Sequence, residues 1–135
     1  MRLWHIDLIP YLPKSQLLAQ WRELNSILKK QDNHILINYI YDYNKEVLHD
    51  YTVSVMQEMN NRGYKIYNTE NYINYFILDG IVGNCFKRFK EHDNEYLTIC
   101  YYNLKEKYLR GQKDFDEETW TRLDKFYKKY IKENK

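Results

Sequence analysis

The sequence is poor in the residues that build cofactor loops and disulfide frameworks. Its 135 residues include only four glycines, two prolines and two cysteines. Gly80 and Gly83 stand in DGIVG, which matches neither of the glycine patterns that cradle dinucleotides or phosphates. The GxSxG turn of serine hydrolases is also missing. Cys85 and Cys100 form no CxxC pair, so we expect both to be reduced. If the protein is an enzyme, its nucleophile must come from outside these motifs.

Metal-binding and membrane-spanning patterns are equally scarce. The four histidines are scattered and form no HExxH, so the sequence predicts no metal site and no cofactor. Apolar runs such as residues 35–37 are far too short to cross a bilayer, which predicts no membrane partner. No signal-like segment opens the chain, and we therefore expect a cytoplasmic location.

The charge is nearly balanced over the whole chain but not at its end. The formal net charge is +2, which does not by itself require a nucleic-acid partner. Residues 122–135 carry six Lys or Arg against two Asp or Glu. A basic segment of this kind is either a solvated helix face or a surface that binds anions.

Apolar residues at three- and four-residue spacing predict amphipathic helices over residues 14–30, 45–62 and 93–111. A fourth helix is expected to start at Asp114 or Asp116, with a lysine-rich end. Residues 34–43 are strand-like by propensity, but a buried connector or a short helix fits them equally.

The segment at 64–91 is harder to assign, and a short helix around Tyr72 to Leu78 is the one element that it suggests. Together these patterns predict an all-α protein. We expect one compact domain over residues 1–135, built of three to four amphipathic helices with an N-terminal segment threading between them. Residues 112–135 are interpreted as a C-terminal helical addition, and the protein is expected to be a monomer.

Two segments then show a specific resemblance, and the segment from His92 to Leu104 adds a weaker one. The opening MRLWHIDLIPYLPKSQLLAQWREL ends in Trp21-Arg22-Glu23-Leu24, and His34 precedes the later VMQEMNNRGY, which closes with Arg62-Gly63-Tyr64. These segments resemble the pyrimidine-dimer DNA glycosylase family. The resemblance is strongest over residues 1–30, weaker over 34–66 and thin over 92–110.

The resemblance implies a metal-independent reaction that starts at the chain's own amino group. In this family the α-amino group of the first residue attacks the anomeric carbon, the base leaves, a Schiff base forms and β-elimination cuts the strand. An α-amino group, with an ordinary pKa of about 7.7–8.0, is partly neutral at pH 7, whereas a lysine near 10.4 is not. By this resemblance Met1 supplies the amine and Glu23 the acid and base.

The same resemblance assigns DNA contacts. Arg2 and Arg22 are expected to bind phosphates or orient the flipped nucleotide. His5 and His34 stand beside matched segments and could line the site, although a hydrogen-bonded structural role is the better interpretation for either histidine alone. Apart from the resemblance, Lys29, Lys30 or the C-terminal tail is expected to hold the DNA backbone.

Two departures from the family pattern concern the nucleophile and the grip on DNA. Met1 is expected to be retained because Arg2 is large, so a bulkier side chain must fit beside the sugar. Ser26 stands where the family has a phosphate-contacting arginine. Residues 126–130, FYKKY, resemble the family's C-terminal aromatic-lysine strip, but they also fit an ordinary helix stripe.

The sequence therefore predicts a DNA repair glycosylase with abasic-site lyase activity on damaged double-stranded DNA, without metal or cofactor. Cyclobutane dimers, oxidised pyrimidines and abasic sites all remain open as substrates. Two other hypotheses stay open at this stage. One is a non-catalytic helical module that binds nucleic acid, and the other is a protein-interaction domain.

Overall fold

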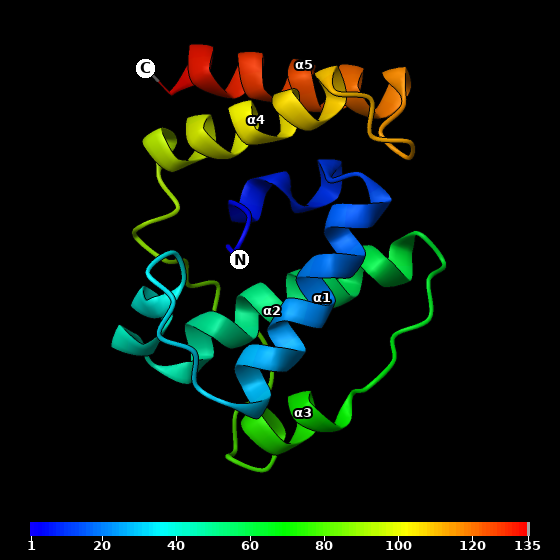
Figure 1. The fold of residues 1–135 in the computed structure, drawn as a ribbon. Helices are drawn as coiled ribbons and strands as arrows, with labels where there is room; N and C mark the ends of the chain where they lie inside the picture. The colour runs from blue at the N-terminus through cyan, green and yellow to red at the C-terminus, as the bar shows by residue number, and fades with distance from the viewer. Residues whose placement is uncertain (135) are drawn as a thin grey trace. The chain divides into compact units, whose positions relative to one another are not determined.

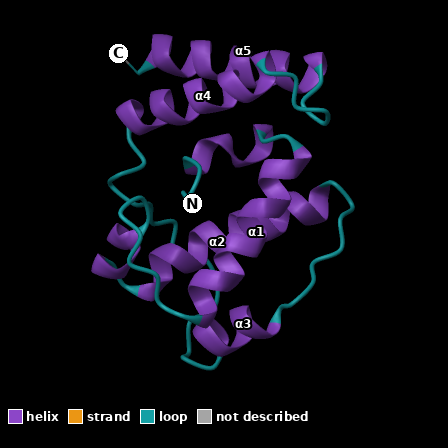
Figure 2. Cartoon of the chain, viewed as in Figure 1, coloured by secondary structure: helices purple, strands orange, loops and turns teal. Residues whose placement is uncertain are grey.

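Helices and connecting loops make up the fold. The computed structural model describes residues 1–134, and these contain no β-strand (Figure 2). In chain order the elements are a 3₁₀-helix at Ile6–Tyr11, α1 at Lys14–Lys29, a 3₁₀-helix at Asn38–Asp42, α2 at Lys45–Asn61, the short α3 at Glu70–Tyr72, a π-helix at Ile73–Ile77, α4 at Asn94–Leu109 and α5 at Glu117–Glu133 (Figure 1). The all-α prediction is confirmed. Across the described residues, no helix combines the length and apolar character that a bilayer crossing requires.

The two C-terminal helices begin at aspartate caps. The Asp93 carboxylate accepts the backbone N–H of Tyr96 at 2.9 Å at the start of α4, and the Asp116 carboxylate accepts that of Thr119 at 2.8 Å at the start of α5. Asp116 is therefore the cap of α5. The other candidate, Asp114, accepts the backbone N–H of Ser15 at 2.6 Å instead.

The start and end of α2 follow the sequence prediction in position. Asn44 stands at its N-cap, although its side chain makes no capping hydrogen bond. Gly63 lies just beyond the last turn with a φ of +79°, a left-handed conformation that glycine adopts without strain. The segment 34–43 contains the 3₁₀-helix Asn38–Asp42, so the short-helix alternative is the one observed.

The chain folds into two compact units that interleave along the sequence. The first unit comprises Met1–Leu3 and Leu18–Phe89, and the second comprises Trp4–Leu17 and the residues from Lys90 onward. The predicted single domain with 112–135 as an addition stays a prediction. In the structure α5 belongs to the second unit, together with α4.

The core of the first unit is formed by α1, α2 and the π-helix. One apolar stripe from each helix is buried, namely Leu24, Ile27 and Leu28 on α1 and Tyr51, Val55 and Met59 on α2. Phe76 of the π-helix is also completely buried. The predicted stripes of both long helices therefore face the interior, which leaves the polar positions of α1 to form the site.

In the second unit α4 and α5 run side by side in opposite directions (Figure 1). Their contact is rich in stacked aromatic rings. Tyr101 and Tyr127 lie 3.8 Å apart between ring centroids, and Tyr108 and Trp120 lie 5.0 Å apart. Such pairs contribute about 0.5–1.5 kcal/mol each beyond the area that they bury. Many of the chain's tyrosines thus pack the helix pair.

Candidate active site

The candidate site lies in the first unit, where the N-terminus meets α1. Leu3 is completely buried, whereas Met1 keeps 40% of its surface exposed. The backbone carbonyl of Arg2 accepts a hydrogen bond from Nε2 of Gln20 at 3.1 Å. The segment at Arg2 is therefore fixed to α1, and the first residue is partly exposed.

Gln20 connects this segment to the predicted catalytic acid. Its Nε2 also lies 3.3 Å from Oε2 of Glu23, one helical turn further along α1. Its Oε1 accepts the hydroxyl hydrogen of Tyr51 on α2 at 2.9 Å. Gln20 is completely buried and Tyr51 nearly so. One buried amide thus holds the Arg2 backbone and the Glu23 carboxylate in a fixed relation to each other.

The electrostatics of Glu23 show the influence of the same neighbours. Partial burial raises the pKa of its carboxyl group above the usual value, because desolvation disfavours the charged form. The N-terminal ammonium opposes this shift by lowering the pKa, and Arg22 does so to a smaller extent. The terminal amine is therefore near enough to Glu23 for the two charges to interact.

This geometry suits proton transfer between a carboxyl group and a nucleophilic amine. A carboxyl group with a raised pKa both accepts and returns protons more readily near neutral pH than an ordinary glutamate. The amine belongs to Met1, a residue that keeps 40% of its surface exposed. No further residue type is needed for imine chemistry.

The predicted DNA-binding residues of the first unit occupy its surface. Arg22 is exposed on α1 beside Glu23, and Lys29 and Lys30 are exposed at the end of that helix. Six residues of α-helix separate Glu23 from Lys29, a rise of about 9 Å. His34 is exposed in the following loop, where its Nδ1 accepts the backbone N–H of Leu36 at 3.2 Å. Together they add cationic and polar side chains along one end of α1, at and beyond the carboxylate.

His5 is placed differently from the other predicted site residues. It belongs to the second unit and has no exposed surface. Its ring stacks on His92 at 5.4 Å between centroids, and its Nδ1 accepts the backbone N–H of Asp7 at 3.1 Å. This packing favours the structural role over contact with DNA, because a buried ring offers no surface to a ligand.

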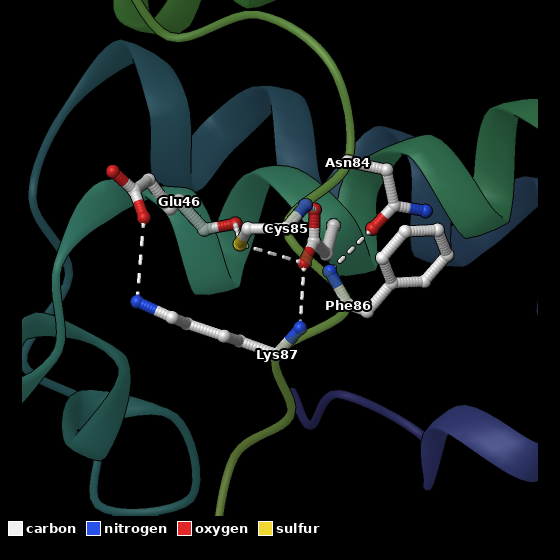
Figure 3. A network of polar contacts seen from close by, with 6 residues as sticks. Glu46, Asn84, Cys85, Phe86 and Lys87 are labelled. Carbon is white, nitrogen blue, oxygen red and sulfur yellow. Dashed lines mark hydrogen bonds and ion pairs between the residues drawn. The ribbon is translucent and has the colours of Figure 1, made fainter.

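A second polar cluster of the first unit joins α2 to the loop at 83–87 (Figure 3). The nearly buried carboxylate of Asp50 accepts the backbone N–H groups of Cys85 at 3.2 Å and Lys87 at 2.9 Å, and its Oδ2 lies 3.0 Å from the Cys85 sulfur. Burial and the Asp50 carboxylate raise the pKa of the Cys85 thiol, which keeps it protonated. Residues 1–134 contain no group of three or more His, Cys, Asp or Glu side chains placed to hold a metal ion. The cluster therefore acts as a clamp on the loop.

The second unit carries a hollow of about 720 Å³ along α5. Its lining combines three cations with aromatic rings: Tyr11, Arg122, Lys125, Phe126, Lys129, Tyr130 and Glu133. Tyr11 stacks on Phe126 at 4.6 Å, and the Arg122 guanidinium lies 5.7 Å from the Tyr11 ring centroid. The predicted aromatic-lysine strip at 126–130 thus takes part in a basic surface hollow.

Two residues of the site were not predicted from the sequence. By its spacing Tyr51 fits the apolar stripe of α2, and no motif in the sequence gives Gln20 a role. The three-residue spacing between Gln20 and Glu23 is the one signal that places both on the same side of a helix. Nothing in the sequence indicates that Gln20 is buried.

Comparison with known proteins identifies the family. The family model named pyrimidine dimer DNA glycosylase matches residues 1–71, just over half of the chain. No match is found among curated proteins or among solved structures. The matched segment includes every member of the candidate site, from Met1 through Gln20 and Glu23 to Tyr51, and stops before α4 and α5. The chain belongs to the pyrimidine dimer DNA glycosylase family, whose members act on DNA as repair glycosylases.

Proposed function

We propose that this glycosylase also cleaves the strand at the resulting abasic site, through a Schiff base formed by the α-amino group of Met1. The observation that carries the proposal is the interaction of the N-terminal ammonium with Glu23, the carboxyl group that the family resemblance assigns as acid and base. Gln20 supports it, because its amide bonds to both Arg2 and Glu23.

The reaction has two stages. In the first, the neutral amine attacks C1′ of the damaged nucleotide, a nitrogen–carbon bond forms, and the glycosidic electron pair leaves with the base, which takes up a proton. Opening of the sugar ring then gives a protonated imine. In the second, a proton leaves C2′, the C3′–oxygen bond breaks, and the 3′ phosphate departs. Water finally hydrolyses the imine and releases the enzyme.

Glu23 serves both stages. As a carboxylate it stabilises the positive charge that develops on the sugar as the base departs. It then exchanges protons with the sugar oxygen during ring opening and accepts the C2′ proton during elimination. Its raised pKa suits this alternation because burial makes the protonated form easier to reach than in an ordinary glutamate.

The substrate on this proposal is damaged double-stranded DNA. The exposed Arg22, with Lys29, Lys30 and His34 further along, offers cationic and polar contacts to phosphates around the flipped nucleotide. Arg2 lies next to the reacting amine and is expected to orient the target nucleotide. Unstacking the target costs a few kcal/mol, and damage lowers that cost.

Borohydride trapping tests the proposal directly. An oligonucleotide with one abasic site is incubated with the protein and reduced, so that any imine becomes a stable covalent adduct. We expect an adduct from wild type, located at the Met1 nitrogen by mass spectrometry of the N-terminal peptide. Glu23→Gln should lower the trapping rate by about 10²–10⁴-fold. The matched control Glu70→Gln, at an exposed position of α3, should leave it unchanged.

Two outcomes would overturn the proposal. An adduct on a lysine side chain would show that another amine is the nucleophile. Salt-sensitive DNA binding with no adduct from wild type would favour the non-catalytic binding module instead.

A further inference from the structure

Phe86 has an unusual position in the loop of the first unit. Its side chain is 87% exposed, and its φ of +56° lies in the left-handed region, which a bulky side chain rarely adopts. Because the ring is exposed, the fold does not gain the free energy of removing it from water. The backbone conformation adds strain. Neither feature helps the fold, so the ring is a candidate for contact with a ligand.

Hydrogen bonds hold the backbone of the loop that carries this ring. The backbone N–H of Phe86 donates to Oδ1 of Asn84 at 2.8 Å. The residues on either side, Cys85 and Lys87, are both bonded through their N–H groups to the buried Asp50. Figure 3 shows the Phe86 ring pointing away from the Glu46–Lys87 ion pair. A loop backbone that is already held in place loses little conformational freedom when its side chain binds a partner.

The charges beside the ring favour a polyanionic partner. Lys87 and Arg88 follow Phe86 directly, and both are exposed. The Lys87 ammonium pairs with Glu46 at 3.5 Å, but both side chains are about half exposed, so solvent weakens the pair. A phosphate can therefore take the place of Glu46 as partner of Lys87. An apolar ring flanked by cations matches a base step flanked by phosphates.

We propose that Phe86 is a wedge that inserts into the base stack of double-stranded DNA, with Lys87 and Arg88 on the flanking phosphates. The inference rests on the proposed function, and it adds the device that opens the duplex. Insertion of an apolar side chain unstacks one base step and kinks the helix, which eases extrusion of the neighbouring nucleotide. Phe86 lies outside residues 1–71, so the family match does not assign it.

Fluorescence of 2-aminopurine, placed next to an uncleavable abasic analogue in a duplex, reports the unstacking. Wild type should raise the fluorescence on binding, and Phe86→Ala should remove most of that rise and weaken binding about tenfold. Phe86→Trp should retain both, because it keeps a stacking ring. Val82→Ala, which truncates another exposed apolar residue of the same region, is the matched control and should behave as wild type.

Trapping on two substrates separates this inference from the proposed function. Phe86→Ala should trap a single-stranded abasic oligonucleotide at the wild-type rate, since no duplex has to open, and should be slower on the duplex. Equal fluorescence and affinity for wild type and Phe86→Ala would overturn the wedge even if trapping succeeds. Unstacking that depends on Phe86, with no trapping on either substrate, would support the wedge and end the lyase proposal.

The variant is expected to fold. The exposed ring buries almost no surface, so the thermal midpoint of Phe86→Ala should match that of wild type. Equal midpoints would show that any loss of unstacking comes from the missing ring. A clearly lower thermal midpoint of Phe86→Ala, together with loss of unstacking in Phe86→Trp, would mean that the ring stabilises the fold, and it would overturn the wedge.

Discussion

Nε2 of Gln20 lies 3.3 Å from Oε2 of Glu23, and the same nitrogen donates to the backbone carbonyl of Arg2 at 3.1 Å. The proposed nucleophile and the proposed acid therefore depend on one buried amide. Tyr51 fixes the orientation of that amide by donating to its oxygen. Because Oε1 of Gln20 bonds to Tyr51 on α2, its Nε2 points to the Arg2 carbonyl and the Glu23 carboxylate.

Gln20→Leu should lower the stability of the fold and should also change the pH dependence of the trapping rate. The variant leaves the Arg2 carbonyl and the Tyr51 hydroxyl without this partner, which should lower the free energy of unfolding by about 1–3 kcal/mol. Loss of the bond to the Glu23 carboxylate should also raise the pKa of Glu23 further, because that bond favours the charged form. We expect the acidic limb of the trapping rate to move to higher pH.

The control is Gln57→Leu, at an exposed position on α2. It should leave both the pH profile and the unfolding midpoint close to wild type. A Gln20→Leu protein that is less stable but keeps the wild-type pH profile would assign Gln20 to the core alone.

The free energy of unfolding of wild type, relative to that of Glu23→Gln, should fall as the pH rises. Its pKa is raised in the folded state, chiefly by desolvation, so the folded protein binds the proton more tightly than the unfolded chain does. The free energy of unfolding therefore carries a favourable contribution below the ordinary glutamate pKa, and this contribution disappears as the pH rises through the folded value. Glutamine does not titrate and lacks this dependence.

Urea unfolding of both proteins between pH 3.5 and 8 measures the effect. The difference in unfolding free energy, wild type minus Glu23→Gln, should fall with pH and then level off. A difference that rises with pH would mean that the ammonium and Arg22 outweigh desolvation at this carboxyl group.

The sequence predicted the long helices well because their signal is local. The three- and four-residue spacing on α1 and α2 placed both helices to within a residue or so of the observed bounds, 14–29 and 45–61. The 3₁₀-helix Ile6–Tyr11, with Pro10 inside it, was not predicted, since a short element has too few residues to show a period. The π-helix at 73–77 was suggested only as a short helix.

The site was predictable only in part, for a different reason. Glu23 followed from the family resemblance, and its neighbour Arg22 came with it. Gln20 escaped because a polar side chain in a helix normally faces solvent, and only the tertiary contacts with Arg2 and Tyr51 explain its burial. Phe86 escaped because its exposure depends on bonds from the distant Asp50 to the loop around it.

Asp50→Asn should release this loop. The N–H groups of Cys85 and Lys87 bond to different carboxylate oxygens, and asparagine keeps only one of these. The amide nitrogen that replaces the other cannot accept, so one of the two N–H groups loses its partner. The loss should lower the free energy of unfolding by about 1–3 kcal/mol. Hydrogen exchange should show faster opening of the Cys85 and Lys87 amides.

Glu46→Gln provides the comparison, because it removes the half-exposed ion pair with Lys87 and spares Asp50. It should change the stability by less than about 1 kcal/mol. Equal protection of the Cys85 and Lys87 amides in Asp50→Asn and wild type would show that the carboxylate does not hold the loop.

The hollow along α5 should contribute to the grip on DNA. In the part of the chain that the structure describes, no ion pair engages Arg122, Lys125 or Lys129, so these cations are available to phosphates. Lys125→Gln with Lys129→Gln should weaken binding to damaged duplex and reduce the salt dependence, by about 1–2 units in the slope of log K against log salt concentration. Lys113→Gln with Lys132→Gln removes the same charge at exposed positions outside the hollow and is the matched control. Long-range attraction depends on total charge, whereas contacts with phosphates depend on the position of each cation. An equal loss of slope in both double variants would therefore mean that the net charge, and not the hollow, determines the effect.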